Sequence, residues 1–305
     1  VVNPLVEKVS SIAYAVGKTS EVTFKITDKY FDKVQMTNEV LKNNIKVLVN
    51  GQDVTATITK ELSTGTALTE ERTVNGTTTN VQYGVQYTLK ISGYSTEANQ
   101  VKVVIPEGVV TDKDDASSQN NKNKETELIV YNALRKTDTE QEATSGFLGN
   151  DKIERQNIDN VTFEKSIPNS MYNHIEKKIA DNVRAWDISA QGDQSIIAWY
   201  VDSEIRNGTY KIHIATNEQV PGGSEITNTE IFANQNSSYL FNYIGSSDKC
   251  TATEVITNIE LLDVNSVTNM SYMFSNTGYK AMTSLDLGAK FSTANVTDMS
   301  YMFNN

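Results

Sequence analysis

The sequence predicts a mostly β protein with short helices, divided into several domains. Apolar and polar residues alternate over many short stretches between residues 10 and 134, which is typical of strands with one buried face. Asn-Gly pairs at 50–51 and 75–76 indicate tight turns. Near the other end of the chain one phrase of sequence occurs twice, which indicates stacked repeat units.

Residues 1–134 are expected to form the first domain. Its predicted strands are 21–27, 45–49, 54–58, 83–91, 101–105 and 126–133. Asn50-Gly51 predicts a hairpin between the second and third, and Pro106 ends the fifth because proline cannot donate to a ladder. Six or seven short strands with regular turns predict an immunoglobulin-like β-sandwich, here without the Cys…Trp…Cys core of antibody domains.

The middle of the chain is predicted to hold a linker and a cap. Residues 135–160 begin with a charged, polar run and are assigned to a linker. Residues 161–235 contain strand patterns at 186–188, 195–200 and 209–214. Because a stack of repeats must cover the open end of its apolar core, we assign 161–235 to an N-terminal cap.

Residues 236–305 are assigned to the repeats. Residues 264–276 recur as 293–305, with equivalent residues 29 positions apart. The stretch 283–288 alternates like a short strand, and four apolar residues follow helical spacing. These four are Val267, Met270, Met273 and Phe274, with Ser266 or Asn295 as candidate caps. A short strand and a short helical turn, repeated, describe a leucine-rich-repeat unit.

These residues also carry a family resemblance. The phrases NVTDMSYMF, SVTNMSYMF and MTSLDLG resemble the BspA-type leucine-rich repeats of bacterial surface proteins. The phrase IPEGVVTDKDD, followed by KETE, resembles the last hairpin of bacterial Ig-like domains. The resemblance implies attachment to a cell surface and adhesion to host or neighbouring-cell macromolecules, without catalysis.

The array is expected to be truncated. Repeats bury their apolar faces only by stacking, and a polar unit normally closes the stack. We therefore expect further copies of the 29-residue phrase, and self-association of this fragment through an exposed apolar face. That face is predicted to comprise Leu285, Leu287, Met299, Met302 and Phe303.

Composition narrows the range of partners. The net charge is −11 and no run of Lys or Arg forms a basic stripe, which argues against nucleic-acid binding. Cys250 is the only cysteine, so no internal disulfide can form. No apolar run reaches the roughly eighteen residues needed to span a bilayer. We expect an extracellular location on the bacterial surface, with signal and anchor outside this fragment.

No catalytic pattern is found in the sequence. GxSxG, GxGxxG, P-loop, HExxH and CxxC motifs are absent. The two histidines, His174 and His213, stand apart in sequence from Cys250, and a structural role is the simpler interpretation of both. Trp186 and Trp199 fit a sugar-binding groove or, more simply, a core. The sequence therefore predicts no enzyme and no cofactor.

Calcium is the one candidate ion. Asp112, Asp114 and Asp115 lie in one loop after a strand, and carboxylate oxygens are ligands that calcium prefers. The loop lacks the Gly and terminal Glu of an EF-hand, and a solvated acidic loop is the simpler alternative.

A binding face is predicted from strand alternation. If Ile259, Leu261, Leu285 and Leu287 point into the core, their neighbours Asn258, Glu260, Ser284 and Asp286 lie on the exposed strand face. We expect this face to bind an extracellular protein or glycan. Two alternatives stay open: a carbohydrate-binding accessory region of an extracellular hydrolase, and a passive spacer.

Overall fold

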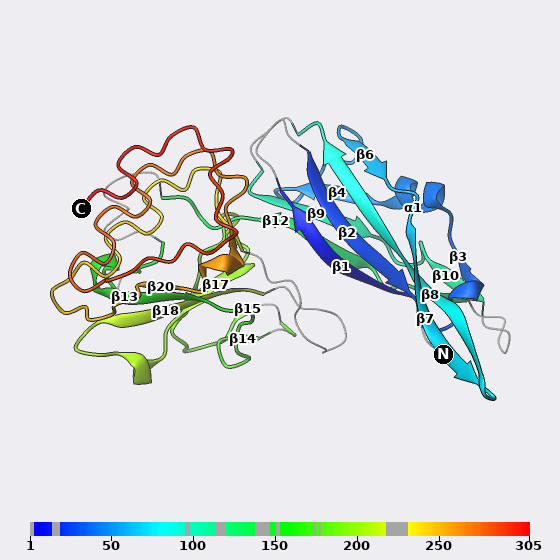
Figure 1. The fold of residues 1–305 in the computed structure, drawn as a ribbon, viewed down its shortest axis with the longest axis horizontal. Coiled ribbons are helices and arrows are strands. Elements are labelled where there is room, and N and C mark those ends of the chain that lie inside the picture. The colour runs from blue at the N-terminus through cyan, green and yellow to red at the C-terminus, as the bar shows by residue number, and fades with distance from the viewer. Residues whose placement is uncertain are drawn as a thin grey trace. The chain divides into compact units, whose positions relative to one another are not determined.

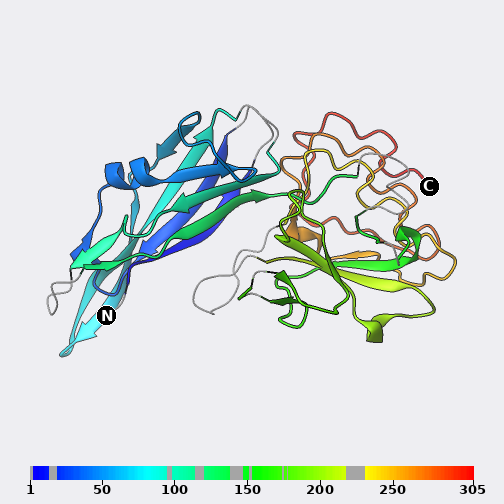
Figure 2. The ribbon, with the colours of Figure 1, turned by 180° about the vertical axis from the view of Figure 1, so that it is seen from behind.

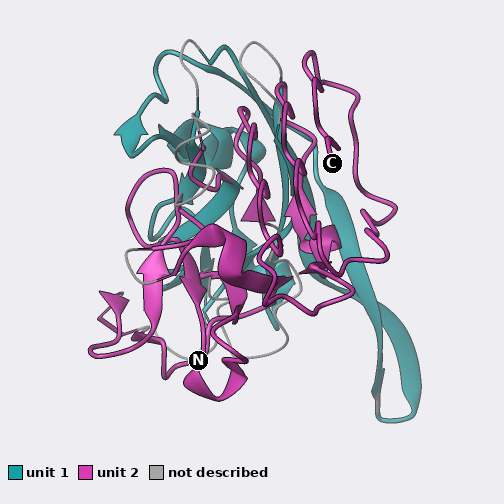
Figure 3. Ribbon diagram, turned by 90° about the vertical axis from the view of Figure 1, so that its left-hand side faces the viewer, with its two compact units in different colours: residues 1–131, 220–228 teal, residues 132–219, 229–305 magenta. Residues whose placement is uncertain are grey.

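The computed structural model describes residues 3–13, 19–94, 98–113, 120–137, 147–150, 153–173, 175–176, 178–217 and 231–305. The chain forms two compact units, residues 1–131 with 220–228 and residues 132–219 with 229–305 (Figure 3). The predicted mostly β architecture is confirmed, since strands dominate both units and the only α-helix among the described residues is α1, Asn38–Asn44.

The first unit is built from antiparallel strands in two main layers (Figures 1 and 2). One sheet has the order β1 (Leu5–Ile12), β2 (Ser20–Thr27), β8 (Thr77–Ser92), β6 (Thr59–Leu62), with β7 (Thr66–Val74) also paired to β8. The other has the order β12 (Thr126–Asn132), β9 (Gln100–Ile105), β4 (Lys46–Val49), β5 (Gln52–Asp53). A small third sheet joins β11 (Asn120–Lys122), β10 (Thr111–Lys113) and β3 (Val34–Gln35), and the 3₁₀ turn η1 is Phe31–Lys33.

Alternation decides which face of each strand is buried. In β2 every second residue is buried, with Val22, Phe24 and Ile26 each at 0% exposure. Phe24 packs against Tyr87 of β8 with ring centroids 5.7 Å apart. The residues between them stay partly exposed, as expected for a sheet with one face in a core. The immunoglobulin-like topology assigned to this unit stays a prediction.

Both Asn-Gly pairs form hairpin turns. Asn50 and Gly51 have φ of 50° and 77° and join β4 to β5. The second pair connects β7 and β8, so the threonine-rich segment around it is a long hairpin rather than a loop. The predicted strand at 54–58 is wrong. Asp53 Oδ1 accepts bonds from Thr55 N and Oγ1, 3.0 and 2.6 Å away, and turns the chain out of the sheet.

The second unit has a mixed five-stranded sheet. Its order is β16 (Ala185–Asp187), β17 (Ile196–Trp199), β18 (Tyr210–Thr216), β13 (Ile158–Phe163), β20 (Ile256–Thr257). Strand β13 pairs in parallel with both β18 and β20. The smaller elements are β14 (Tyr172–Asn173), β15 (Lys178–Ile179), β19 (Ile231–Phe232), β21 (Leu262–Asp263), η2 (Arg155–Asn157), η3 (Asp202–Glu204) and η4 (Ile259–Leu261).

Three short coils lie in the chain after β18, with β20 between the first and the second. We define them as coil 1 (236–244), coil 2 (269–276) and coil 3 (298–305), which run side by side as yellow, orange and red traces (Figures 1 and 2). Parallel bridges join Asn236 to Asn269 and Asn269 to Asp298, and so fix their register. The apolar side chains of coils 1 and 2, with Met302 of coil 3, share one core cluster with the inner face of the sheet.

The helical turn predicted for each repeat is wrong. Residues 270–276 form successive turns, and Tyr272 and Asn276 have left-handed φ values of 56° and 57°. A left-handed residue at every fourth position breaks an α-helix, yet it keeps the i, i+3, i+4 spacing of apolar residues. The segment 283–288, predicted as a strand, is also irregular.

Four described residues of the predicted linker lie in the core of the second unit, whereas Arg135, Lys136, Glu154 and Gln156 are exposed. Phe147, Leu148, Ile153 and Ile158 are buried in the same cluster as the sheet, and β13 begins at Ile158. The polar run at the start of the segment had suggested solvent exposure. The apolar residues later in the segment instead contribute to the core, and Arg155, which lies among them in the sequence, is fully buried.

Candidate binding surface

Each coil starts with an Asn or Asp that organises a turn. Asn269 Oδ1 accepts bonds from the backbone N and Oγ of Ser271, at 2.8 and 2.7 Å. Asp298 does the same for Ser300, at 2.9 and 2.7 Å. Such a carboxylate or amide oxygen mimics a backbone acceptor and holds the chain in a turn. The recurring Asn/Asp-x-Ser of the sequence is therefore the signal for this local structure.

The backbone hydrogen bonds between coils run in one direction. From coil 2, the amides of Met270, Tyr272 and Phe274 donate to coil 3 carbonyls 28 positions further along the chain, over 2.8–3.0 Å. Alternate amides of coil 1 donate to coil 2 in the same sense. The amides between them, such as Met273 N to Met270 O, close turns within their own coil. Along this run, each coil therefore uses donors on one edge and acceptors on the other.

Aromatic rings stack along the coils. The rings of Tyr239 and Tyr272 lie 4.8 Å apart and those of Tyr272 and Tyr301 lie 4.9 Å apart, nearly parallel in both cases. A second column joins Phe241 to Phe274 at 5.4 Å and Phe274 to Phe303 at 5.5 Å. These spacings are close to the separation of neighbouring strands in a sheet. The phenylalanine column starts in the core, and the tyrosine column lies at the surface.

Arg155 covers the acceptor edge of coil 1. Its side chain is fully buried and donates to the carbonyls of Tyr239, Leu240 and Asn242, the last two over 2.9 and 3.2 Å. The Leu240 and Asn242 carbonyls correspond to the acceptors that coil 2 offers to coil 1. A cation at the carbonyl end of aligned peptide groups is favourable, as at the C-terminus of a helix. Sequence reasoning missed this residue.

The four predicted binding residues are all exposed. Asn258, Glu260, Ser284 and Asp286 face solvent, Ile259 is buried, and Leu261, Leu285 and Leu287 pack partly against the core. The structure brings 283–288 beside 253–260, because Thr283 N donates to Thr253 O over 3.1 Å. The in-and-out pattern thus matches the prediction, although 3₁₀ and irregular backbone replace the expected strands.

The core residues predicted for the repeats divide by coil. Met270, Met273 and Phe274 are buried, as is Met302. Met299 and Phe303 are 50% and 59% exposed, which agrees with the exposed apolar face predicted to include them. Met302, predicted for the same face, is instead buried.

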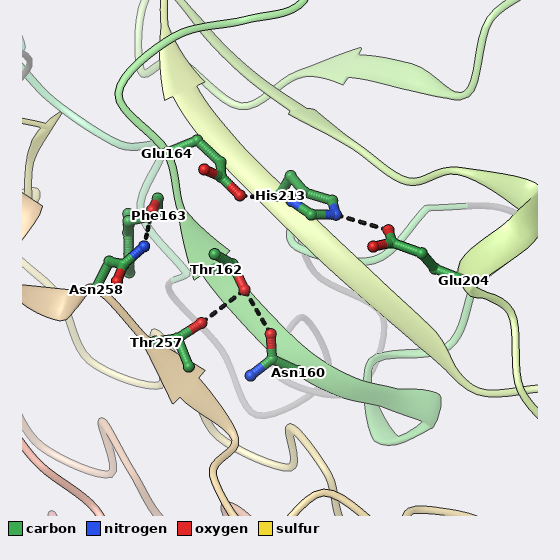
Figure 4. A network of polar contacts seen from close by, with 8 residues as sticks. All are labelled: Asn160, Thr162, Phe163, Glu164, Glu204, His213, Thr257 and Asn258. Atoms are coloured by element: carbon green, nitrogen blue, oxygen red, sulfur yellow. Dashed lines mark hydrogen bonds and ion pairs between the residues drawn. The ribbon is translucent and has the colours of Figure 1, made fainter.

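Polar contacts join the sheet to the repeats (Figure 4). Thr162 of β13 bonds to Thr257 of β20 over 2.6 Å and donates to Asn160 Oδ1. The Asn258 amide donates to the Phe163 carbonyl over 2.9 Å. Asn258 has a left-handed φ of 57°, so its side chain supports a sharp turn from β20 into η4. Two of the four predicted binding residues therefore also have a structural role: Asn258 here, and Asp286, whose Oδ1 accepts a bond from Gly288 N over 2.8 Å.

His213 lies between two carboxylates. Its Nδ1 is 2.9 Å from Glu164 Oε1 and its Nε2 is 2.7 Å from Glu204 Oε2 (Figure 4). Both ring nitrogens therefore lie within hydrogen-bond distance of a carboxylate oxygen. The ring also stacks on Trp199. His174 lies outside the described residues.

The predicted calcium loop is only partly described. Asp114 and Asp115 lie outside the described residues, and Asp112 is buried, with Oδ1 accepting a bond from Asn121 N. Burial, followed by the charge of Asp112, raises the pKa of nearby Asp28. In the described part of the chain, no three or more His, Cys, Asp or Glu residues are grouped to hold a metal.

Cys250 is buried and bonds weakly to the Gln156 carbonyl over 3.4 Å. Burial, reinforced by the charge of Asp159, raises the pKa of its thiol to about 11. A thiol of this kind is protonated at neutral pH and is a poor nucleophile. None of the described helices has the length and apolar character needed to cross a membrane.

Comparison with known proteins gives one likeness. Residues 246–305 match the family model described as Mycoplasma protein of unknown function, DUF285, which spans coils 2 and 3 and the segment before them. The match covers less than half of the chain. No curated protein and no solved structure matches the chain.

Proposed function

We propose that this chain is part of a cell-surface adhesion protein that recognises host or neighbouring-cell macromolecules through its repeat region, without catalysis. The proposal includes an extracellular location on a bacterial surface and a protein or glycan as ligand. The likeness to a Mycoplasma family covers only the repeat region, and that family has no stated function. The ligand and the adhesive role therefore rest on the surface described below.

The observation that carries the proposal is the repetition of exposed side chains. Residues 283–288 run beside 253–260, so Ser284 and Asp286 continue the exposed surface that Asn258 and Glu260 begin. Solenoid proteins commonly bind ligands on such repeated faces. The two carboxylates, Glu260 and Asp286, favour a ligand with basic or hydrogen-bond-donating groups.

The absence of catalysis is also proposed from contacts. His213 has both nitrogens turned to carboxylates, and Cys250 is buried with a raised pKa. A base and a nucleophile within hydrogen-bond reach of each other are the usual requirement for covalent catalysis. Neither residue meets it in this arrangement.

A binding assay with matched charge reversals tests the proposal. The chain would be applied to immobilised extracellular-matrix proteins and to a glycan array. The double variant Glu260→Lys with Asp286→Lys should lose most of any saturable binding, because it reverses the proposed face. The control Glu71→Lys changes an exposed carboxylate of β7 in the other unit and should bind normally.

The possible results distinguish the three candidate functions. Circular dichroism would first establish that the variants fold. Protein binding lost only in the double variant supports adhesion through this face. Binding confined to glycans favours a carbohydrate-binding accessory region, and no saturable binding at all favours a passive spacer. Binding unaffected by the double variant contradicts the assigned surface.

A further inference from the structure

Two acidic residues of the first unit are buried without a cationic partner. Asp28, directly after β2, and Asp112 of β10 are 5% and 4% exposed. Among the described residues, no Lys, Arg or His forms an ion pair with either carboxyl. Lys29, next to Asp28 in the chain, instead places its Nζ 5.3 Å from the centre of the Tyr30 ring. Buried charges in proteins are paired, neutralised by protonation or bound to a metal, so these two carboxyls need a partner that the described residues do not supply.

The fold brings the two carboxyls together beside η1. Asp28 is held just before this turn, because its Oδ1 accepts a bond from Tyr30 N over 2.7 Å. The turn η1 contacts β10, where Asp112 is paired with Val34, the residue after η1. Burial raises the pKa of Asp28, and the charges of Asp112 and Asp32 raise it further, as expected for neighbouring carboxyls. The exposed Asp32 thus adds to the negative charge around the buried pair.

One oxygen of this pair has no hydrogen-bond partner. Asp28 Oδ2 is buried and bonds to no described residue, whereas Oδ1 accepts the bond from Tyr30 N. Asp112 Oδ1 accepts a bond from Asn121 N over 3.2 Å. A buried oxygen without a partner is costly and indicates a group that the polypeptide does not provide. A single proton shared by the pair would leave one negative charge buried, whereas a divalent cation neutralises both.

We propose that Asp28 and Asp112 together bind one calcium ion beside η1. Calcium prefers carboxylate oxygens, and two carboxylates supply up to about four of its roughly six to eight ligands, with backbone carbonyls and water as the others. Magnesium fits less well, because an ion held by residues this buried must shed most of its water, which magnesium loses reluctantly. The bound ion links the small third sheet, through β10, to the sheet that contains β2.

This site differs from the calcium loop predicted from the sequence. Both include Asp112, but the predicted loop combines it with Asp114 and Asp115, its neighbours in the chain. Asp28 follows a strand of another sheet in the first unit, and no spacing in the sequence joins it to Asp112.

Calorimetric titration of the chelator-treated full chain with calcium chloride tests the proposal. One saturable site should appear, with a dissociation constant on the order of 10⁻⁴–10⁻³ M, as for extracellular calcium modules. Magnesium chloride should bind at least about tenfold more weakly. Calcium should also slow hydrogen exchange at the amides of Tyr30 and Asn121, which donate to the two carboxylates.

Two variants locate the site. Asp28→Asn and Asp112→Asn each keep a side-chain oxygen for the existing backbone bond, and each should weaken calcium binding by about tenfold or more. Without calcium, Asp28→Asn should melt at or above the temperature of the parent at pH 7, because it removes a buried like-charge repulsion. This second readout separates the loss of a ligand from the loss of the fold. Glu71→Gln changes an exposed carboxylate of β7 and is the control that should bind calcium normally.

The proposal is wrong if calcium does not bind saturably, if both Asn variants keep the parental affinity, or if Glu71→Gln weakens binding as much as they do. A parent chain that binds no calcium, but that Asp28→Asn stabilises at pH 7, would assign the pair to a shared proton instead. All these substitutions lie in the first unit, so the results are independent of the adhesion surface, which is tested at Glu260 and Asp286.

Discussion

Phe241, Phe274 and Phe303 occupy the same place in three successive coils, yet their exposed fractions are 0%, 3% and 59%. Coil 1 is covered by Arg155 and the sheet, coil 2 lies between two coils, and coil 3 has a neighbour on one side. The same residue in the same local backbone thus experiences three environments. The comparison shows that neighbouring coils, rather than local sequence, determine how much of a repeat residue is buried.

The largest effect on stability is expected when Arg155, which bonds the carbonyl edge of coil 1, is replaced. Arg155→Met leaves the buried carbonyls of Leu240 and Asn242 without their guanidinium donors, each costing roughly 1–3 kcal/mol, whereas the Tyr239 carbonyl still accepts a bond from Asn242 N, so the expected loss is on the order of 4 kcal/mol. Urea unfolding followed by tryptophan fluorescence measures it, because Trp186 and Trp199 both lie in the second unit.

Two related variants keep that test informative if Arg155→Met fails to fold. Arg155→Lys retains the charge but cannot bond three carbonyls in the same fork, so a smaller loss is expected. Arg184→Met changes an exposed arginine and should stay within about 0.5 kcal/mol of the parent. Equal effects of the 155 and 184 substitutions to Met would refute the capping role.

The second test truncates the middle ring. Phe274→Ala should lower the free energy of unfolding by about 3–5 kcal/mol, as for buried aromatic residues generally. The same tryptophan signal reports the change. A loss below roughly 1 kcal/mol would be typical of a surface site and would contradict the stacked arrangement.

The third test makes the same change at the exposed edge. Phe303→Ala should cost less than about 1 kcal/mol, because the ring touches Phe274 on one face and solvent on the other. If it proves as damaging as Phe274→Ala under the same conditions, the environments of coils 2 and 3 do not differ as described.

The smallest effect is expected at the turn that opens coil 3. The pKa of the Asp298 carboxyl is lowered from its usual value of 3.8. The larger cause is the hydrogen bond from the Ser300 side chain, and the smaller is the bond from the Ser300 backbone amide. Because the folded-state pKa is depressed, this contribution to stability is present above pH 3.8 and is lost as the pH falls through the lower folded value.

Asn269 fills the equivalent place in coil 2 and does not titrate there. Asp298→Asn should therefore leave stability at pH 7 nearly unchanged and remove a small part of the acid dependence. Unfolding curves of parent and variant at pH 7 and pH 3 make the comparison. A larger loss of stability in the variant at pH 3 than at pH 7 would reverse the expected sign.

The regular strands could be predicted from sequence because their signals are local. Alternation located β2, β9 and β12, and Asn-Gly located two hairpin turns. Helix α1 was missed, although Thr37 caps it by accepting a bond from Val40 N. In the repeats, helical spacing was a false signal, since four-residue turns with a left-handed fourth residue place apolar side chains at the same intervals.

The candidate surface could be predicted only where the exposure of a residue follows from alternation along the sequence. Asn258, Glu260, Ser284 and Asp286 are exposed as expected. The partners of His213 come from other elements, so no spacing in the sequence joins Glu164 to it. Arg155 stands in a polar stretch that resembles a linker, and its carbonyl partners lie more than 80 positions away.

The one-way backbone hydrogen bonding of the coils also limits where residues can be inserted or deleted. Tyr239 and Tyr272 are 33 positions apart, whereas Tyr272 and Tyr301 are 29 apart, yet the ring columns and the donor pattern are unbroken. The four extra residues are therefore absorbed between the coils. Inside a coil, a single inserted residue would place turn amides where the inter-coil donors stand. Length variation in this region should accordingly be tolerated in the connecting segments and excluded from the coils themselves.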